Sequence, residues 1–223
     1  MRVSHDEGSS TFLAQLERFL DVVSGLGDEQ LLAASRCRGW TAGDLLVHVH
    51  LGLQELLLGL LDPTDSPPDV DAATYWRAEV PRSDPDADAP AGVRFVRLLG
   101  AAYRRPSGVV GHLRPTVLGV ARAVRACDPG AVRFQGHVIA TGDFLATWAV
   151  ELAVHQLDLG PDTPPPDAGA LRMARTTIES LAGAFPSAWS DEVVALAGTG
   201  RVGLGPAERR EAGEVAGRLP AFG

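Results

Sequence analysis

The sequence predicts an almost entirely α-helical fold, with four principal helices before residue 165 and a helical extension after it. Two observations support this prediction. Apolar residues recur at helical spacing over long segments, and clusters of Gly, Pro and Asp separate these segments. At 223 residues the chain is long enough to bury a sizeable core. We therefore expect a four-helix bundle over residues 1–165, with residues 166–223 packing on it as a helical extension.

The segment 39–63 shows how the helices are delimited. Thr41 is its predicted N-cap, and Asp44, three residues later, completes a weaker version of the capping box, which usually has Glu or Gln at that position. Pro63 closes the segment because proline cannot continue a helix. The sequence thus predicts a helix between Thr41 and Pro63.

The other helices follow from similar signals. We expect further helices over residues 10–27, 93–104, 116–129, 142–160, 170–185 and 206–219. Ser10 or Thr11 is expected to cap the first helix and Thr141 the helix at 142–160, and a break is expected between Pro106 and Pro115. Residues 62–92 are rich in Pro, Asp and Ser, which predicts a long surface loop with one short helical turn. Only residues 131–146 contain a short β-like stretch.

Composition excludes several classes of function. The formal net charge is -8, which argues against a nucleic-acid partner. No apolar run reaches the roughly 18 residues that span a bilayer, and the first ten residues lack a signal core, so we expect a cytoplasmic protein with no membrane partner. All 20 basic residues are arginine, which is typical of a high-GC actinobacterial coding sequence.

The two cysteines, Cys37 and Cys127, are far apart in the sequence. In a cytoplasmic chain they are expected to be reduced and unpaired. Neither belongs to a CxxC pair, and on that ground we expect no cysteine-based zinc site.

Glu151 and His155 lie four residues apart in the apolar run "FLATWAVELAVHQL". At that spacing the two side chains project from one face of a helix. Such a pair can be a solvated surface contact worth a few tenths of a kcal/mol. Alternatively, it can supply two ligands to a metal in the core of a bundle. The apolar context favours the metal, because a buried glutamate without a partner costs several kcal/mol.

A third ligand would come from the helix that contains His48 and His50. Two residues apart, these histidines point in nearly opposite directions, so only one of them can join the site. The surrounding residues are apolar nearly all round, and periodicity does not decide between them. Two imidazoles and one carboxylate suit Zn²⁺ with an open position, and could also hold Fe²⁺, Ni²⁺ or Mn²⁺.

Two stretches resemble a known family. "CRGWTAGDLLVHVHLG" and "TGDFLATWAVELAVHQLDLG" are similar to the two motifs of the mycothiol-dependent maleylpyruvate isomerase group of the DinB-like superfamily. The resemblance implies a DinB-like four-helix bundle with a metal bound by His48, Glu151 and His155. It favours His48 over His50. Asp158, one turn past His155, either orients a ligand imidazole or caps the helix end.

The resemblance also implies a reaction. A divalent metal, with Zn²⁺ as the expected ion, would bind the low-molecular-weight thiol mycothiol as a thiolate, which attacks a small electrophile and leads to isomerisation or S-transfer. Residues 62–92 and the tail containing Arg201 are expected to cover the open side of the metal. Arg201 would hold a substrate carboxylate or form a surface salt bridge. Family enzymes have a larger C-terminal domain than residues 166–223, which argues against maleylpyruvate as the substrate.

Two other functions remain open at this point. Metal-bound water could make the protein a hydrolase, or the bundle could be a metal-binding stress protein without turnover. A monomer or a homodimer is compatible with the sequence.

Overall fold

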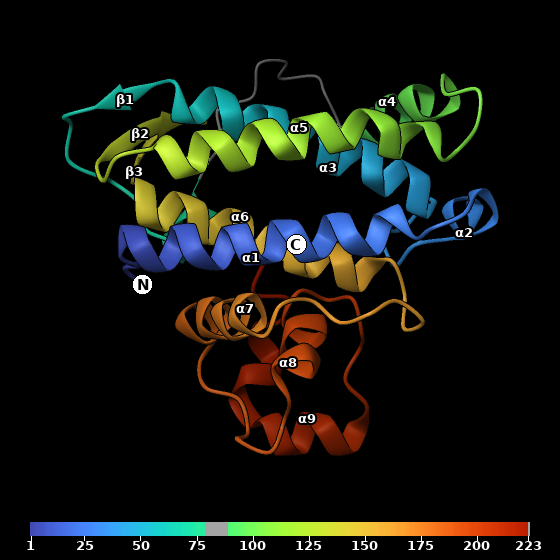
Figure 1. The fold of residues 1–223 in the computed structure, drawn as a ribbon. Helices are drawn as coiled ribbons and strands as arrows, with labels where there is room; N and C mark the ends of the chain where they lie inside the picture. Colours follow the sequence, from blue (N-terminus) through green and yellow to red (C-terminus); the bar gives the residue numbers. More distant parts are fainter. Residues whose placement is uncertain (79–88, 223) are drawn as a thin grey trace.

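The computed structural model describes residues 1–78 and 89–222. Its centre is a four-helix bundle, so the predicted all-α class is confirmed (Figure 1). The four helices are α1 (His5–Ser24), α3 (Ala42–Leu60), α5 (Gly108–Ala126) and α6 (Thr141–Asp158). Helix α1 packs on α6 and α5, and α3 packs on α5 and α6. The apolar faces that the periodicity predicts meet in one core.

The bundle is tightest where α1 crosses α6. Gly8 and Gly142 face each other there, and a Cβ atom on Gly8 would lie only 2.3 Å from the carbonyl oxygen of Gly142. Phe12 and Phe19 on α1 and Phe144 on α6 are fully buried. The two glycines therefore let the backbones of α1 and α6 approach each other closely beside this buried core.

The N-terminal part of α1 differs from the prediction. The helix begins at His5 with Ser4 as its N-cap, so the expected start at Ser10 or Thr11 is wrong. The hydroxyl of Ser4 accepts a hydrogen bond from the backbone N–H of Glu7 (3.2 Å). Packing on α6 extends the helix beyond the position that the local capping signal indicated.

The predicted capping box of α3 is confirmed. The hydroxyl of Thr41 accepts from the N–H of Asp44 (3.1 Å), and the carboxylate of Asp44 accepts from the N–H of Thr41 (2.9 Å). Two backbone donors at the start of the helix are satisfied in this way. The box fixes where α3 begins, and hence which turn carries His48.

The β-like stretch is a hairpin. Strands β2 (Ala131–Phe134) and β3 (His137–Ala140) are antiparallel, and β1 (Pro63–Thr64) pairs with β2. The turn residues Gln135 and Gly136 have φ values of 48° and 84°, as a two-residue type I′ turn requires.

Helix α6 follows β3 directly, with Ala140 as its N-cap, so the predicted capping role of Thr141 is wrong. The Thr141 hydroxyl instead accepts from the N–H of Gly130 (3.1 Å) and lies 2.9 Å from Nδ1 of His5. Tertiary contacts with the N-terminal helix thus occupy the group that the sequence pattern assigned to the cap.

The segment 62–92 is less irregular than expected. Besides β1 it contains the 3₁₀ helix η1 (Thr74–Arg77), which is the expected short helical turn, and the start of α4 (Ala89–Ala101). Residues 79–88 of the expected loop lie outside the described residues.

The expected break near Pro106 is confirmed, because α4 ends at Ala101 and α5 begins at Gly108. The expected resumption after Pro115 is wrong, since α5 runs without interruption through that residue. Proline removes one backbone hydrogen bond of the helix. A buried apolar stripe along the same helix outweighs that loss. The stripe consists of Val109, Leu113, Val117, Val120 and Val124.

The C-terminal elements gather on the α1–α6 side of the bundle (Figure 1). Helix α7 packs on α6 and α1, and α8 packs on α7 and α6. These elements are α7 (Ala168–Ala182), α8 (Asp191–Gly198), α9 (Pro206–Ala212) and η2 (Gly213–Arg218); the short α2 (Asp28–Leu32) precedes α3. The sequence did not predict α8, and the helix expected over 206–219 is divided between α9 and η2. No helix within residues 1–78 and 89–222 is both long and apolar enough to cross a membrane.

Candidate functional site

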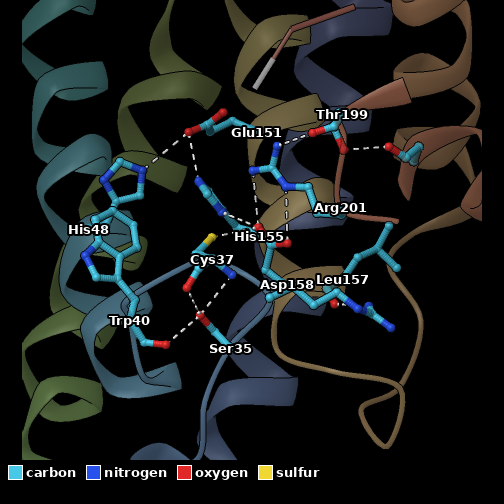
Figure 2. Close-up of polar contacts among 12 residues, drawn as sticks. Ser35, Cys37, Trp40, His48, Glu151, His155, Leu157, Asp158, Thr199 and Arg201 are labelled. Carbon is cyan, nitrogen blue, oxygen red and sulfur yellow. Dashed lines mark hydrogen bonds and ion pairs between the residues drawn. The ribbon is translucent and has the colours of Figure 1, made fainter. Parts of the chain in front are cut away.

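His48, Glu151 and His155 lie together between α3 and α6 (Figure 2). Oε1 of Glu151 is 3.6 Å from Nε2 of His48 and 3.0 Å from Nε2 of His155. One potential ligand atom from each of the three residues lies within 4.8 Å of the others. The three side chains that the resemblance picked out are thus brought together by the fold.

Ring packing orients the two imidazoles. The rings of His48 and His155 meet edge to face, with centroids 4.9 Å apart, and the indole of Trp40 lies 5.0 Å from the His48 ring. His50 points elsewhere, with its ring 6.4 Å from that of His112 on α5. The opposite orientation of His48 and His50 follows from their spacing of two residues on a helix.

Asp158, the last residue of α6, is a fully buried carboxylate. Its Oδ2 lies 3.0 Å from Nδ1 of His155 and 3.1 Å from Sγ of Cys37. Arg201 reaches the same carboxylate, with Nε 3.3 Å from Oδ1 and Nη2 3.4 Å from Oδ2, and also donates to the carbonyl of Thr199 (3.0 Å). These contacts satisfy the buried charge and hold the imidazole of His155 in one orientation.

Arg201 therefore does not face an open substrate site. Its side chain is only 16% exposed, and the ion pair with Asp158 is buried rather than on the surface. The expectation that Arg201 covers the open side and binds a substrate carboxylate is not met by this geometry. The sequence could not show this, because the two residues are 43 positions apart.

The electrostatics of the site follow from these contacts. Burial opposes the charge on His155, but the carboxylate of Glu151 and the hydrogen bond with Asp158 raise the pKa of His155 well above its usual value. Burial alone would raise the pKa of Glu151, yet the charge of His155 and the hydrogen bonds with His155 and His48 hold it well below normal. The pKa of Asp158 is lowered for the same reason, by His155 and Arg201 against the effect of burial. A proton and a cation would compete for the same ring nitrogen of His155.

Cys37 is a residue that the sequence reasoning missed. Its sulfur, His155 and Asp158 form a second group whose potential ligand atoms lie within 4.8 Å of one another. The absence of a CxxC pair therefore did not exclude a cysteine beside the candidate site. Cys37 lies in the loop before α3, where its N–H donates to the hydroxyl of Ser35 (3.2 Å). Cys37 is the first residue of the family-like stretch "CRGWTAGDLLVHVHLG", and this position was the only signal in the sequence argument that pointed to it.

The same loop also covers the end of α6. The backbone N–H of Arg36 donates to the carbonyl of Asp158 (2.9 Å), and the guanidinium of Arg36 donates to the carbonyl of Leu157. Carbonyl groups at the end of a helix have no partner within the helix, so Arg36 satisfies two of them. The loop and α6 are thereby fixed relative to each other around Cys37.

A pocket of about 580 Å³ opens above the three candidate ligands. Its lining includes all three of them and side chains from α3, η1, α4, the β2–β3 turn and α6. Residues 62–92 contribute Tyr75 and Trp76, so part of the segment expected to cover the open side does so.

The donor set fits a small divalent cation. Four-coordinate zinc with ligands at about 2.0–2.1 Å holds neighbouring donor atoms about 3.3 Å apart. The distances of 3.0 and 3.6 Å from Oε1 of Glu151 to the two histidine nitrogens lie on either side of that value. Because Asp158 contacts Nδ1 of His155, Nε2 is the ring nitrogen that faces the other two ligands.

The fold and the site together define a helical-bundle protein whose facing helices form a candidate centre for a divalent metal at the floor of a pocket. The model of the family "Mycothiol maleylpyruvate isomerase N-terminal domain" matches residues 12–160. The chain belongs to this family.

Two solved structures have a similar fold, that of a mycothiol-dependent maleylpyruvate isomerase and that of a mutant of it. The mutant is 17% identical, with a TM-score of 0.57 over 81% of this chain and 73% of its own. The other structure is 16% identical, with a TM-score of 0.56 over 80% of this chain and 71% of its own. At these identities the likeness shows the fold alone. No curated protein matches the chain.

Proposed function

We propose that this protein is a divalent-metal-dependent enzyme that uses a low-molecular-weight thiol, mycothiol, to isomerise a small electrophile or to transfer the thiol to it. The observation that carries the proposal is the meeting of His48, Glu151 and His155 at the floor of the pocket. The family match and the fold of the mycothiol-dependent isomerase support the choice of thiol.

Zinc is the metal we propose. Two imidazoles and one carboxylate are a usual ligand set for catalytic zinc and leave a coordination position open. When bound, a divalent cation lowers the pKa of a thiol so that it reacts as the thiolate, the nucleophilic form.

The other residues of the site act on the ligands. Asp158 fixes the orientation of His155, and Arg201 neutralises the buried charge of Asp158. Trp40 packs against His48 and restricts its ring. Aromatic and aliphatic side chains line most of the pocket, so a bound substrate would displace water from the reacting groups, which favours addition of the thiol over hydrolysis.

Metal analysis of the purified protein is the first test. We expect about one divalent ion per chain in the wild type and little in His155→Ala, because removal of one of three ligands opens the site. His112→Ala is a matched control, since it removes an exposed imidazole on α5. Equal metal content in wild type and His155→Ala would contradict the proposed ligands.

Thiol dependence is the second test. The zinc-loaded protein is incubated with an α,β-unsaturated ketone, and its absorbance is followed with and without mycothiol. Consumption should require both the thiol and an intact His155. Turnover of an ester without any thiol would instead indicate a hydrolase, and metal binding without either activity would indicate a binding protein.

A further inference from the structure

The walls of the pocket above the candidate ligands are mainly aromatic and aliphatic. Besides the two histidine ligands, five aromatic side chains of the described residues line it, from the loop before α3, from η1, from α4 and from α6. They are Trp40, Tyr75, Trp76, Phe95 and Trp148. Aliphatic side chains of α3, α4 and α6 fill the spaces between them, so most of a ligand's surface would touch carbon.

The charge of the pocket is negative. Glu55 and Glu151 are its carboxylates, and no lysine or arginine occurs among the described residues that line it. Arg201 is already paired with Asp158. A dicarboxylate would therefore lose its hydration without meeting a cationic side chain of these residues. The charge of a divalent metal bound at the candidate ligands would be balanced by the carboxylates of Glu55 and Glu151.

Some polar groups of the wall are hydrogen-bonded to one another, whereas Nε1 of Trp40, Trp76 and Trp148 has no hydrogen-bond partner among the described residues. The hydroxyl of Tyr75 donates to Oε1 of Gln135 (2.8 Å), and Nε2 of Gln135 lies 3.5 Å from Oε2 of Glu55. Burial, with the charges of Glu151 and Glu55, raises the pKa of Tyr75, so its phenol stays neutral. The hydroxyl of Tyr75 is thus already engaged, and the three indole N–H groups are neutral donors that can bond the carbonyl oxygen of an uncharged ligand.

The aromatic wall is also held in place from outside. The ring of Phe222, near the C-terminus, stacks on Trp76 with centroids 4.2 Å apart and an angle of 23° between the planes. Trp76 also packs edge to face against Tyr75. A wall fixed in this way suits a flat, apolar ligand, because its rings need little reorganisation on binding.

We infer that this pocket selects a neutral electrophile whose reactive carbon is attached to an apolar, planar group, and that it disfavours dicarboxylates such as maleylpyruvate. The inference rests on the proposed function for the reaction itself. It concerns the chemical class of the second substrate, which the pocket walls determine.

Binding without thiol tests this inference separately from the reaction. Zinc-loaded protein is titrated with 4-phenylbut-3-en-2-one, a neutral aromatic enone, and with maleate, and binding is followed by ligand-observed NMR. We expect the enone to bind at least about tenfold more tightly than maleate, since only the enone matches the apolar walls. Equal or tighter binding of maleate, or no binding of the enone, would overturn the inference.

A charge reversal sharpens the test. Glu55→Arg, an exposed position at the pocket, should strengthen maleate binding severalfold and change enone binding little. Glu17→Arg on the exposed face of α1 is the control for total charge. If the two variants change maleate binding equally, the pocket charge does not determine specificity.

The results remain separable from those of the metal and thiol assays. Thiol-dependent turnover combined with a preference for maleate would retain the proposed function and reject the inference. A preference for the enone without thiol-dependent turnover would support the inference about the pocket and reject the proposed function.

Discussion

The guanidinium of Arg201 and the carboxylate of Asp158 form a buried ion pair between the C-terminal segment and the end of α6 (Figure 2). The same carboxylate contacts Nδ1 of His155 at 3.0 Å. Residues after α8 are thus connected to a candidate metal ligand through two polar contacts. The C-terminal segment thereby stabilises the geometry of the site without entering the pocket.

Asp158→Asn should weaken zinc binding. The variant keeps the size of the side chain but removes the charge that orients His155 and makes its imidazole a better ligand. Loss of such a partner lowers metal affinity about 10–100-fold. Competition with a chelating indicator measures the change, and Asp162→Asn, at an exposed position after α6, is the control. Unchanged affinity in Asp158→Asn would show that the contact does not support the site.

Arg201 and Asp158 should also be coupled in stability. Arg201→Gln leaves a buried carboxylate without its guanidinium partner, so the free energy of unfolding should fall by about 2–4 kcal/mol. Arg201→Gln combined with Asp158→Asn should cost less than the sum of the two single changes, by about 1–3 kcal/mol. Urea denaturation of the four proteins gives the coupling free energy. Simple additivity would mean that the pair contributes nothing of its own.

Two helical glycines should respond in opposite ways to substitution by alanine, because of the two only Gly8 lies at the close crossing of α1 and α6. Gly8→Ala places a Cβ against the carbonyl of Gly142, so it should lower the free energy of unfolding by about 1–3 kcal/mol or more. Gly119→Ala in α5 meets nothing within 4 Å and should raise it by about 0.5–1 kcal/mol, because alanine favours the helix. Thermal or urea unfolding compares them. A tolerated Gly8→Ala would contradict the close approach.

Asp71 gives a prediction about pH. Its carboxylate accepts from the N–H groups of Thr74 (2.9 Å) and Ala73 (3.0 Å) at the start of η1 and lies 2.9 Å from the backbone nitrogen of Met1. Burial opposes ionisation, but these contacts lower the pKa of Asp71 from 3.8 to about 2. The depressed pKa means that the carboxylate stabilises the fold above pH 4, and that this contribution disappears as the pH falls towards 2.

Asp71→Asn should therefore lower the free energy of unfolding by about 1 kcal/mol at pH 7, after allowance for solvent screening. The difference from wild type should shrink between about pH 4 and pH 2, where the wild-type carboxylate takes up its proton. Urea unfolding at pH 7, 4 and 3 measures it, with the exposed Asp65→Asn as control. A difference that grows as the pH falls would contradict the assignment.

The helices and the ligand pair could be predicted from local information. The capping box of Thr41 and Asp44 and the spacing of Glu151 and His155 each depend on residues within one helical turn, where geometry is nearly fixed. Where packing overrides local signals, the prediction failed: α1 begins before its expected cap, and α5 continues through Pro115. The division of the chain at residue 165 stays a prediction.

The sequence by itself determined the helical pattern, the family motifs and the residues proposed as ligands. Only the tertiary structure decided that Cys37 and Arg201 both meet Asp158, and that Tyr75, Gln135 and Phe222 build or support one wall. The physical reason is the distance along the chain. Contacts between residues many tens of positions apart depend on how whole elements pack, and neither periodicity nor capping chemistry extends that far.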